Sequence, residues 1–162
     1  MSLNLARRGG DIVKLRVCDV LNADGTFKSH VIFNHEQKTN KRSMILLNSK
    51  TIEALKMYFD SLKEYRMSDW LFPKLNNPSE HMSVDGMRRM LQRAVAALNI
   101  DMKIGTHSLR KTMPYHVITN STSTEDEVIV SQFLKHSNIK TTYHYIGRSQ
   151  SEMDNFVEAN GL

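Results

Sequence analysis

The sequence predicts an α+β fold that is mostly α-helical, with a small β-hairpin at one edge. Two observations lead to this prediction. Apolar residues recur at helical spacing in most of the patterned segments, and only residues 26–34 and 42–47 form the short runs typical of strands. The 162 residues, 40% hydrophobic and 24% charged, contain no repeat and no Gly/Ser-rich linker. We therefore expect a single domain over residues 1–162, built on one core.

The first half of the chain supplies the hairpin and one long helix. A short helix is expected around residues 11–15, and the two strands follow it, joined by the polar turn 35–41. Apolar residues then recur at helical spacing just after Asn48-Ser49, which can cap a helix, so an amphipathic helix is predicted over about 50–65. The sequence Trp-Leu-Phe-Pro at 70–73 ends in a helix-stopping proline and is expected to pack as a hydrophobic plug.

The second half is predicted to be helical. Its clearest helix follows Ser83 and carries an apolar stripe, in which we expect Met87 and Met90 to be core residues, with arginines on the opposite face. Thr106 is the expected N-cap of the next helix, which Pro114 kinks or shortens.

Two more helices are predicted to close the chain. A capping box at Thr124–Glu127 marks the start of the first of them. The second, over 149–159, has three apolar residues on one side: Met153, Phe156 and Val157. This apolar side can pack either on the chain's own core or on a neighbouring copy.

Composition narrows the class of protein. The 22 Lys and Arg outnumber the 17 Asp and Glu and leave a net charge of +5, which favours polyanionic partners. No segment has the ~20 apolar residues of a membrane helix, and residues 1–10 lack the apolar block of a signal peptide, so we expect a cytoplasmic protein. The single cysteine, Cys18, rules out an internal disulfide, and the seven histidines show no metal-ligand spacing, so neither a metal nor a cofactor is expected.

Three groups of polar residues can carry chemistry. His107 and Arg110 are three apart on a predicted helix, so both face one side, where an imidazole and a guanidinium can meet a cluster of anionic oxygens. His136 lies nine positions before Tyr145, and Arg8 stands three before an aspartate. Each group alone is weak evidence for a site.

Taken together and in this order, these groups resemble the tyrosine recombinases, or phage-integrase family. The matching segments, in chain order, are Arg8-x-x-Asp11-Ile12-x-x-Leu15, Gln37 to Lys41, Trp70 to Pro73, Thr106 to Thr112, and Leu134 to Ser137 leading to Thr141-Thr142-x-x-Tyr145. The resemblance implies the catalytic domain of a DNA recombinase or integrase of bacterial, phage or mobile-element origin.

The resemblance also assigns a role to each matching residue. Tyr145 attacks the scissile phosphate and leaves a 3′-phosphotyrosyl link with a free 5′-hydroxyl. A tyrosine has an ordinary pKa of ~10, so the nucleophile needs a cationic site to lose its proton. Arg8 and Arg110 clamp the non-bridging oxygens, which suits the planar fork of guanidinium.

The remaining matches complete this implied site. His107 bonds the phosphate and is able to relay the nucleophile's proton, and His136 is a second phosphate donor. Lys38 protonates the leaving 5′-oxygen as a general acid, and Asp11 orients the site. Because the bond energy is kept in the phosphotyrosine, the implied reaction needs neither ATP nor a metal ion.

Several alternatives stay open at the level of sequence. Tyr143 is the rival nucleophile, Lys41 the rival acid and Arg7 the rival of Arg8. The family often has histidine after the second arginine and glycine before the last histidine, where this chain has Lys111 and Lys135. Lys135 either restricts the backbone at a turn or adds a phosphate contact. Rival functions are a type IB topoisomerase, a noncatalytic DNA-binding relative and a generic basic helical domain.

The resemblance further implies partners and a missing part. Double-stranded DNA is the expected partner, bound by a homotetramer of the full-length protein, and the fragment itself is expected to be a monomer. Residues 1–3 look like a vector-derived start. We therefore expect that an upstream DNA-clamping domain and the first helix of the catalytic domain are absent, which would weaken DNA binding.

Overall fold

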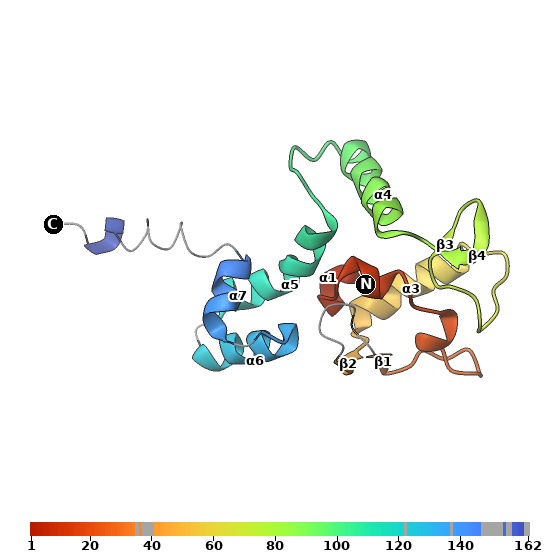
Figure 1. The fold of residues 1–162 in the computed structure, drawn as a ribbon, viewed down its shortest axis with the longest axis horizontal. Helices are drawn as coiled ribbons and strands as arrows, with labels where there is room; N and C mark the ends of the chain where they lie inside the picture. The colour runs from red at the N-terminus through yellow and green to blue at the C-terminus, as the bar shows by residue number, and fades with distance from the viewer. Residues whose placement is uncertain are drawn as a thin grey trace. The chain divides into compact units, whose positions relative to one another are not determined.

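The computed structural model describes residues 1–34, 36, 41–121, 123–136, 138–146, 154 and 157–160. These form two compact units, 1–110 and 111–162, and the division falls within one helix, after Arg110. The elements along the chain are α1 Ser2–Leu5, α2 Gly9–Ile12, the 3₁₀ helix Val17–Asp19, β1 His30–Phe33, β2 Ser43–Leu46, α3 Ser49–Asp60, β3 Pro73–Lys74, β4 Asn77–His81, α4 Val84–Ala97, α5 Thr106–Asn120, α6 Thr124–Leu134 and α7 Ile139–Ile146 (Figure 1). The mostly helical fold with a small antiparallel sheet is confirmed.

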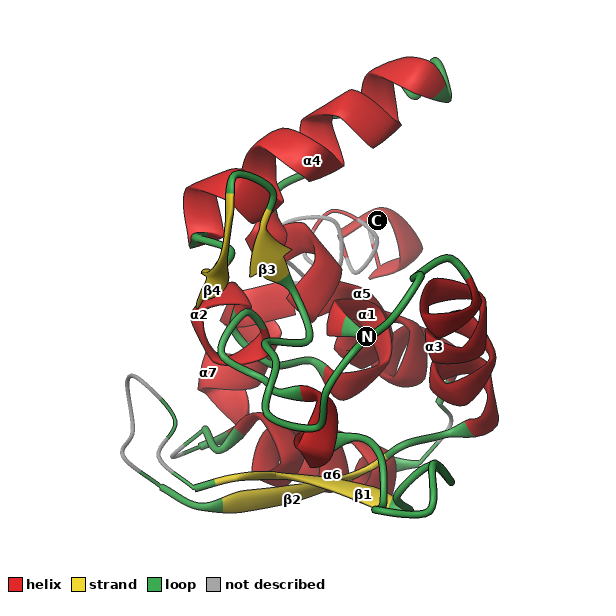
Figure 2. Cartoon of the chain, turned by 90° about the vertical axis from the view of Figure 1, so that its right-hand side faces the viewer, coloured by secondary structure: helices red, strands yellow, loops and turns green. Residues whose placement is uncertain are grey.

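The predicted hairpin is present in the first unit, with shorter strands than expected. β1 and β2 pair antiparallel, with Val31 opposite Ile45 and Ile32 opposite Met44 (Figure 2). Val31 and Ile45 are buried, whereas Ile32 and Met44 on the other face are exposed. This alternation of buried and exposed side chains is the period of two that a half-buried strand requires.

Helix α3 begins where the sequence predicts and ends five residues earlier. The side chain of Asn48 accepts a hydrogen bond from the backbone N–H of Thr51 at 2.9 Å, which confirms the predicted cap. Asn4 of α1 donates to the Oγ1 of Thr51 at 3.1 Å, so the N-terminus of the chain is bound to the start of α3. The helix ends at Asp60, and the expected continuation to residue 65 is wrong.

The segment at 70–73 leads into a second hairpin that the sequence analysis did not predict. Leu71 is buried, as expected of a plug, and its N–H bonds to the carbonyl of Leu15 at 2.8 Å. Pro73 then begins β3, which pairs with β4. The guanidinium of Arg16 lies 3.8 Å from the ring centroid of Trp70 and covers the indole face.

Helix α4 begins directly after Ser83, as predicted, but little of its apolar stripe is buried. Ser83 accepts a bond from the N–H of Gly86 at 3.0 Å and so caps the helix. Met87 is 8% exposed, whereas Met90 is 48% exposed, so the expectation that Met90 is a core residue is wrong. Met87 packs on α2, where its Sδ would lie only 3.3 Å from a Cβ added at Gly9.

The second unit contains the rest of α5 together with α6 and α7, which lie side by side (Figure 1). Pro114 is buried within α5, which runs on to Asn120 and is longer than predicted. The N-cap of α6 is Ser123, whose side chain accepts from the N–H of Glu125, so the capping box predicted at Thr124 is wrong. In the predicted last helix, Met153 and Phe156 lie outside the described residues, and Val157 is helical and exposed.

Candidate active site

The first unit gathers arginines around one backbone carbonyl. The Nε of Arg110 donates to the carbonyl of Ala6 at 3.0 Å, and the Nη1 of Arg7 approaches the same oxygen at 3.5 Å. Arg7 and Arg110 are both 2% exposed. Residues more than a hundred positions apart are thus joined, and the short connection between α1 and α2 lies beside the start of α5.

The carbonyl of Ala6 belongs to a residue with an unusual backbone conformation. Ala6 follows α1 in the left-handed conformation, with φ 45° and ψ 36°, which costs a residue that has a Cβ about 1 kcal/mol. Arg8 follows in an extended conformation and caps the N-terminus of α2. Arg7 and Arg8 thus lie between the two helices, with the side chain of Arg7 buried and that of Arg8 partly exposed.

A buried carboxylate, Glu36, faces these arginines. Its Oε1 lies 3.4 Å from the Nε of Arg7 and its Oε2 lies 3.9 Å from the Nη1 of Arg8. Ser43 of β2 donates a hydrogen bond to the same carboxylate. Burial lowers the pKa of the Arg7 guanidinium, the Glu36 carboxylate opposes this shift, and the positive charge of Arg110 adds to it. Sequence reasoning missed Glu36, because nothing in a polar turn marks one glutamate as buried.

The two rival arginines, Arg7 and Arg8, differ in how far their side chains are exposed. The side chain of Arg8 is 23% exposed, whereas that of Arg7 is 2% exposed and paired with Glu36. Asp11 is buried, and its charge acts on Arg7, as an orienting residue of this cluster would.

His107 lies in the first turn of α5 and is exposed, although Arg110 on the same helix is buried. The structure thus brings Arg8, Asp11 and Arg110 to one region of the first unit.

In the second unit, Lys135 directly precedes His136 and has a left-handed backbone conformation. Lys135 ends α6 with φ 58° and ψ 39°. The N–H of Lys135 bonds to the carbonyl of Gln132, and that of His136 bonds to the carbonyl of Ser131 at 3.0 Å. These bonds close the helix in the Schellman arrangement, whose left-handed position is usually glycine. The backbone at Lys135 is therefore restricted at this turn, which is one of the two expectations for this residue.

Glycine at position 135 should stabilise this turn. We expect Lys135→Gly to raise the free energy of unfolding by about 0.5–1 kcal/mol, because the left-handed conformation carries no Cβ penalty in glycine. Chemical denaturation of the two proteins measures this difference. Lys135→Ala is the matched control, since it shortens the side chain and keeps the Cβ. An equal gain in both variants would show that the side chain, and not the backbone, is responsible.

Tyr145 lies between two basic side chains of the second unit. The ring of His136 packs edge-on against the phenol ring, with centroids 5.2 Å apart and planes at 75°. The Nζ of Lys111 lies 4.9 Å from the centroid of the same ring. The Nδ1 of His136 is 2.9 Å from the Oγ1 of Thr142, a fully buried residue one turn before Tyr145, which orients the imidazole.

The rival tyrosine has a different environment. The hydroxyl of Tyr143 donates a hydrogen bond to the carboxylate of Glu127 on α6. To attack a phosphate, this hydroxyl would have to leave the carboxylate, and the negative charge of Glu127 would repel the phosphate. The geometry within the second unit therefore favours Tyr145 over Tyr143 as a nucleophile.

Of the two candidate general acids, Lys38 lies outside the described residues. Lys41 is exposed, and its backbone carbonyl accepts a bond from the N–H of Glu36 at 3.3 Å. Glu36 thus contacts Lys41 through its backbone and the arginine cluster through its carboxylate.

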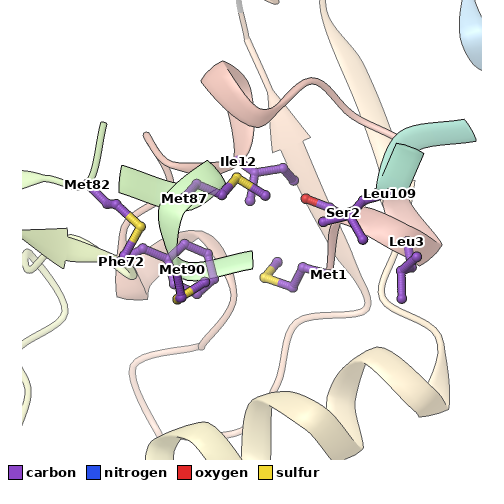
Figure 3. A pocket seen from close by; sticks show the side chains of 9 residues that line it. All are labelled: Met1, Ser2, Leu3, Ile12, Phe72, Met82, Met87, Met90 and Leu109. Carbon is purple, nitrogen blue, oxygen red and sulfur yellow. The ribbon is translucent and has the colours of Figure 1, made fainter. Parts of the chain in front are cut away.

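A recess in the first unit lies apart from this chemistry. It has a volume of about 240 Å³ and is lined by apolar side chains together with Ser2 (Figure 3). Met1 and Ser2 of the N-terminus line it together with Met87 and Met90 of α4. Among the described residues that line it, none has a charged side chain.

In the described part of the chain, no cluster of three or more His, Cys, Asp or Glu side chains is arranged to hold a metal ion. Among the helices of the same described residues, none combines the length and the apolarity needed to span a bilayer.

Comparison with known proteins places the chain in a family. The model of the phage integrase family matches residues 2–152. The chain belongs to this family. Among its relatives, the protein named "Probable integrase/recombinase YoeC" of Bacillus subtilis (strain 168) is 32% identical over 146 residues, which cover 90% of this chain and 72% of that protein. The tyrosine recombinase XerD of Rhizobium meliloti (strain 1021) is 30% identical over 123 residues, 75% of this chain and 38% of that protein.

Solved structures of the phage integrase family share the fold. The XerA recombinase superposes with a TM-score of 0.69 at 19% identity, covering 99% of this chain and 55% of that one. The catalytic domain of the bacteriophage HP1 integrase gives a TM-score of 0.54 at 20% identity, covering 99% of this chain and 79% of that one. The chain thus spans about half of XerA and less than half of XerD. The predicted family and fold class are confirmed.

Proposed function

We propose that this chain is the catalytic part of a tyrosine recombinase that cleaves and rejoins double-stranded DNA through Tyr145. The observation that carries the proposal is the environment of this tyrosine, whose ring lies against the imidazole of His136 and the ammonium group of Lys111. Cations around a phenol favour its ionised form, which is the attacking nucleophile. The membership in the integrase family supports the same assignment.

The reaction follows from the residues in their proposed roles. The phenol oxygen of Tyr145 forms a bond to phosphorus while the bond from phosphorus to the 5′-oxygen breaks. The phenol proton passes to His107, and the leaving 5′-oxygen takes a proton from Lys38 or Lys41. Religation is the reverse of this step, so no ATP is consumed. The proposal requires both units to present these groups to one phosphate.

The arginine cluster supplies the charge that the transition state needs. Arg8 and Arg110 stabilise the negative charge on the non-bridging oxygens as the fifth bond to phosphorus forms. The bond from Arg110 to the carbonyl of Ala6 fixes one edge of its guanidinium. A fixed donor costs little reorganisation at the moment of reaction, which is how a preorganised site lowers a barrier.

A groove with three basic side chains supports DNA as the partner. It has a volume of about 830 Å³, lies along α4 and the β3–β4 turn, and includes Lys74, Arg89 and Arg93 in a lining that is otherwise largely apolar. Lys74 pairs with Glu80, and Arg89 pairs with Asp85. Because basic side chains neutralise phosphates, binding to DNA through this groove should weaken as salt is raised. We propose that the whole protein assembles as a tetramer on two DNA sites.

A trapped covalent adduct tests the proposed function. We expect that a nicked suicide duplex, incubated with the protein and a chelator, gives a DNA-linked protein that survives denaturation. Fragmentation of the linked peptide by mass spectrometry should place the phosphate on Tyr145. Salt-sensitive DNA binding without any adduct would instead identify a noncatalytic relative. Plasmid relaxation by the full-length protein without recombinant product would favour a type IB topoisomerase.

A further inference from the structure

The second unit places a lysine on the face of the proposed nucleophile. Lys111 lies on α5 directly after Arg110, and its Nζ is 4.9 Å from the ring centroid of Tyr145 on α7. This distance is within the ~6 Å over which an ammonium group is attracted to an aromatic ring. Both side chains are only partly exposed, so water screens the interaction less than it would at an open surface.

The other groups around Tyr145 come from α6 and from its own helix. After α6, Lys135 and His136 follow each other, and the imidazole of His136 touches the phenol ring. The carboxylate of Glu127 on α6 is bound by the hydroxyl of Tyr143. On α7, His144 is exposed. Among the described residues of the second unit, Lys111 places a cationic side chain over the ring of Tyr145.

From this arrangement we infer that Lys111 is a positioning residue for strand cleavage, which holds the ring of Tyr145 and favours its ionised form. The inference rests on the proposed function, in which Tyr145 is the nucleophile. A phenol that ionises beside a fixed cation gains attraction that the neutral phenol lacks, so a larger fraction is ready to attack at neutral pH. The proton that leaves the hydroxyl goes to His107, as in the proposed reaction, and Lys111 neither gives nor takes a proton in this step.

Variants at one position separate charge from packing. Lys111→Met keeps an unbranched apolar stem of similar length and removes the charge, whereas Lys111→Arg keeps the charge. Lys140→Met is the matched control. Lys140 is exposed on α7 and lies five residues before Tyr145, which puts it about 140° around the helix. Far-UV circular dichroism checks that each variant is folded.

The first readout is ionisation without DNA. The absorbance of phenolate is recorded against pH for each protein and for the same protein with Tyr145→Phe, and the difference isolates Tyr145 from the other tyrosines. We expect the midpoint of this difference to rise by about half to one pH unit in Lys111→Met. It should move by less than about 0.3 unit in Lys111→Arg and in Lys140→Met.

The second readout is the rate of adduct formation with the nicked duplex across pH. In Lys111→Met we expect a three- to tenfold slower rate at pH 7.5 and a rate close to that of the unchanged protein at high pH. A merely structural role would slow the reaction equally at every pH. An unshifted midpoint in Lys111→Met, or an equal shift in Lys111→Arg, overturns the inference. A shifted midpoint in proteins that form no adduct at any pH overturns the proposed function and leaves the effect of Lys111 on Tyr145 standing.

Discussion

Tyr145→Phe is expected to reduce formation of the covalent DNA adduct by more than about 10³-fold. The substitution removes the attacking oxygen and keeps the ring that packs against His136 and Lys111, so the fold and the binding of DNA should be retained. Single-turnover assays on the nicked duplex measure the rate, and a gel-shift assay at fixed salt measures binding. Loss of both activities together would indicate a folding defect instead of a missing nucleophile.

Tyr143→Phe is the matched control for this prediction. It removes a hydroxyl from the same helix, two residues away, and the hydrogen bond to Glu127 is lost with it. We expect this variant to keep the adduct rate within about threefold and to lose about 1 kcal/mol of stability. Adduct that persists in Tyr145→Phe and disappears in Tyr143→Phe would reverse the assignment of the nucleophile.

The second large effect concerns stability. Glu36→Ala is expected to lower the free energy of unfolding by about 3–5 kcal/mol, because it removes the carboxylate nearest to a buried guanidinium. The side chains of Arg7 and Glu36 are each 2% exposed, so water cannot replace the lost charge easily. Denaturation in urea measures the change. Glu36→Gln keeps an oxygen that can accept from Ser43 and should be less destabilising than Glu36→Ala.

A double-mutant cycle separates the ion pair from the packing around it. Arg7→Met removes the buried cation, so Arg7→Met/Glu36→Ala should be more stable than Glu36→Ala alone. We expect a coupling free energy of about 1–3 kcal/mol between the two positions. If the two single effects simply add, the pair of Arg7 and Glu36 contributes nothing to stability, and Glu36 acts through Ser43 and Arg8.

The elements that were predicted correctly depend on neighbouring residues. Asn48 and Ser83 cap α3 and α4 because a short polar side chain can reach N–H groups two or three residues ahead. The hairpin of β1 and β2 follows from alternating apolar residues on either side of a polar turn. Even here, the choice between adjacent capping residues was wrong at Ser123, since Thr124 has the same local chemistry.

The features that were missed depend on contacts between distant residues. The β3–β4 hairpin contains prolines and polar side chains, and the segment before it is held by Leu15 and Arg16 from far earlier in the chain. Met90 continues the apolar stripe of α4, yet only the first turn of that helix packs on α2. Helical periodicity identifies an apolar face and does not say how much of it finds a partner.

In the candidate site, too, some features follow from the sequence and others depend on contacts between distant residues. The residue types and their order along the chain were enough to recognise the family and, through that resemblance, to propose roles for Arg8, Arg110, His136 and Tyr145. Folding alone brought the carbonyl of Ala6 to Arg110, buried Glu36 against Arg7 and laid Lys111 on the ring of Tyr145. Such pairings depend on burial and on charges that belong to residues far apart in the sequence. They therefore form only once the chain has packed.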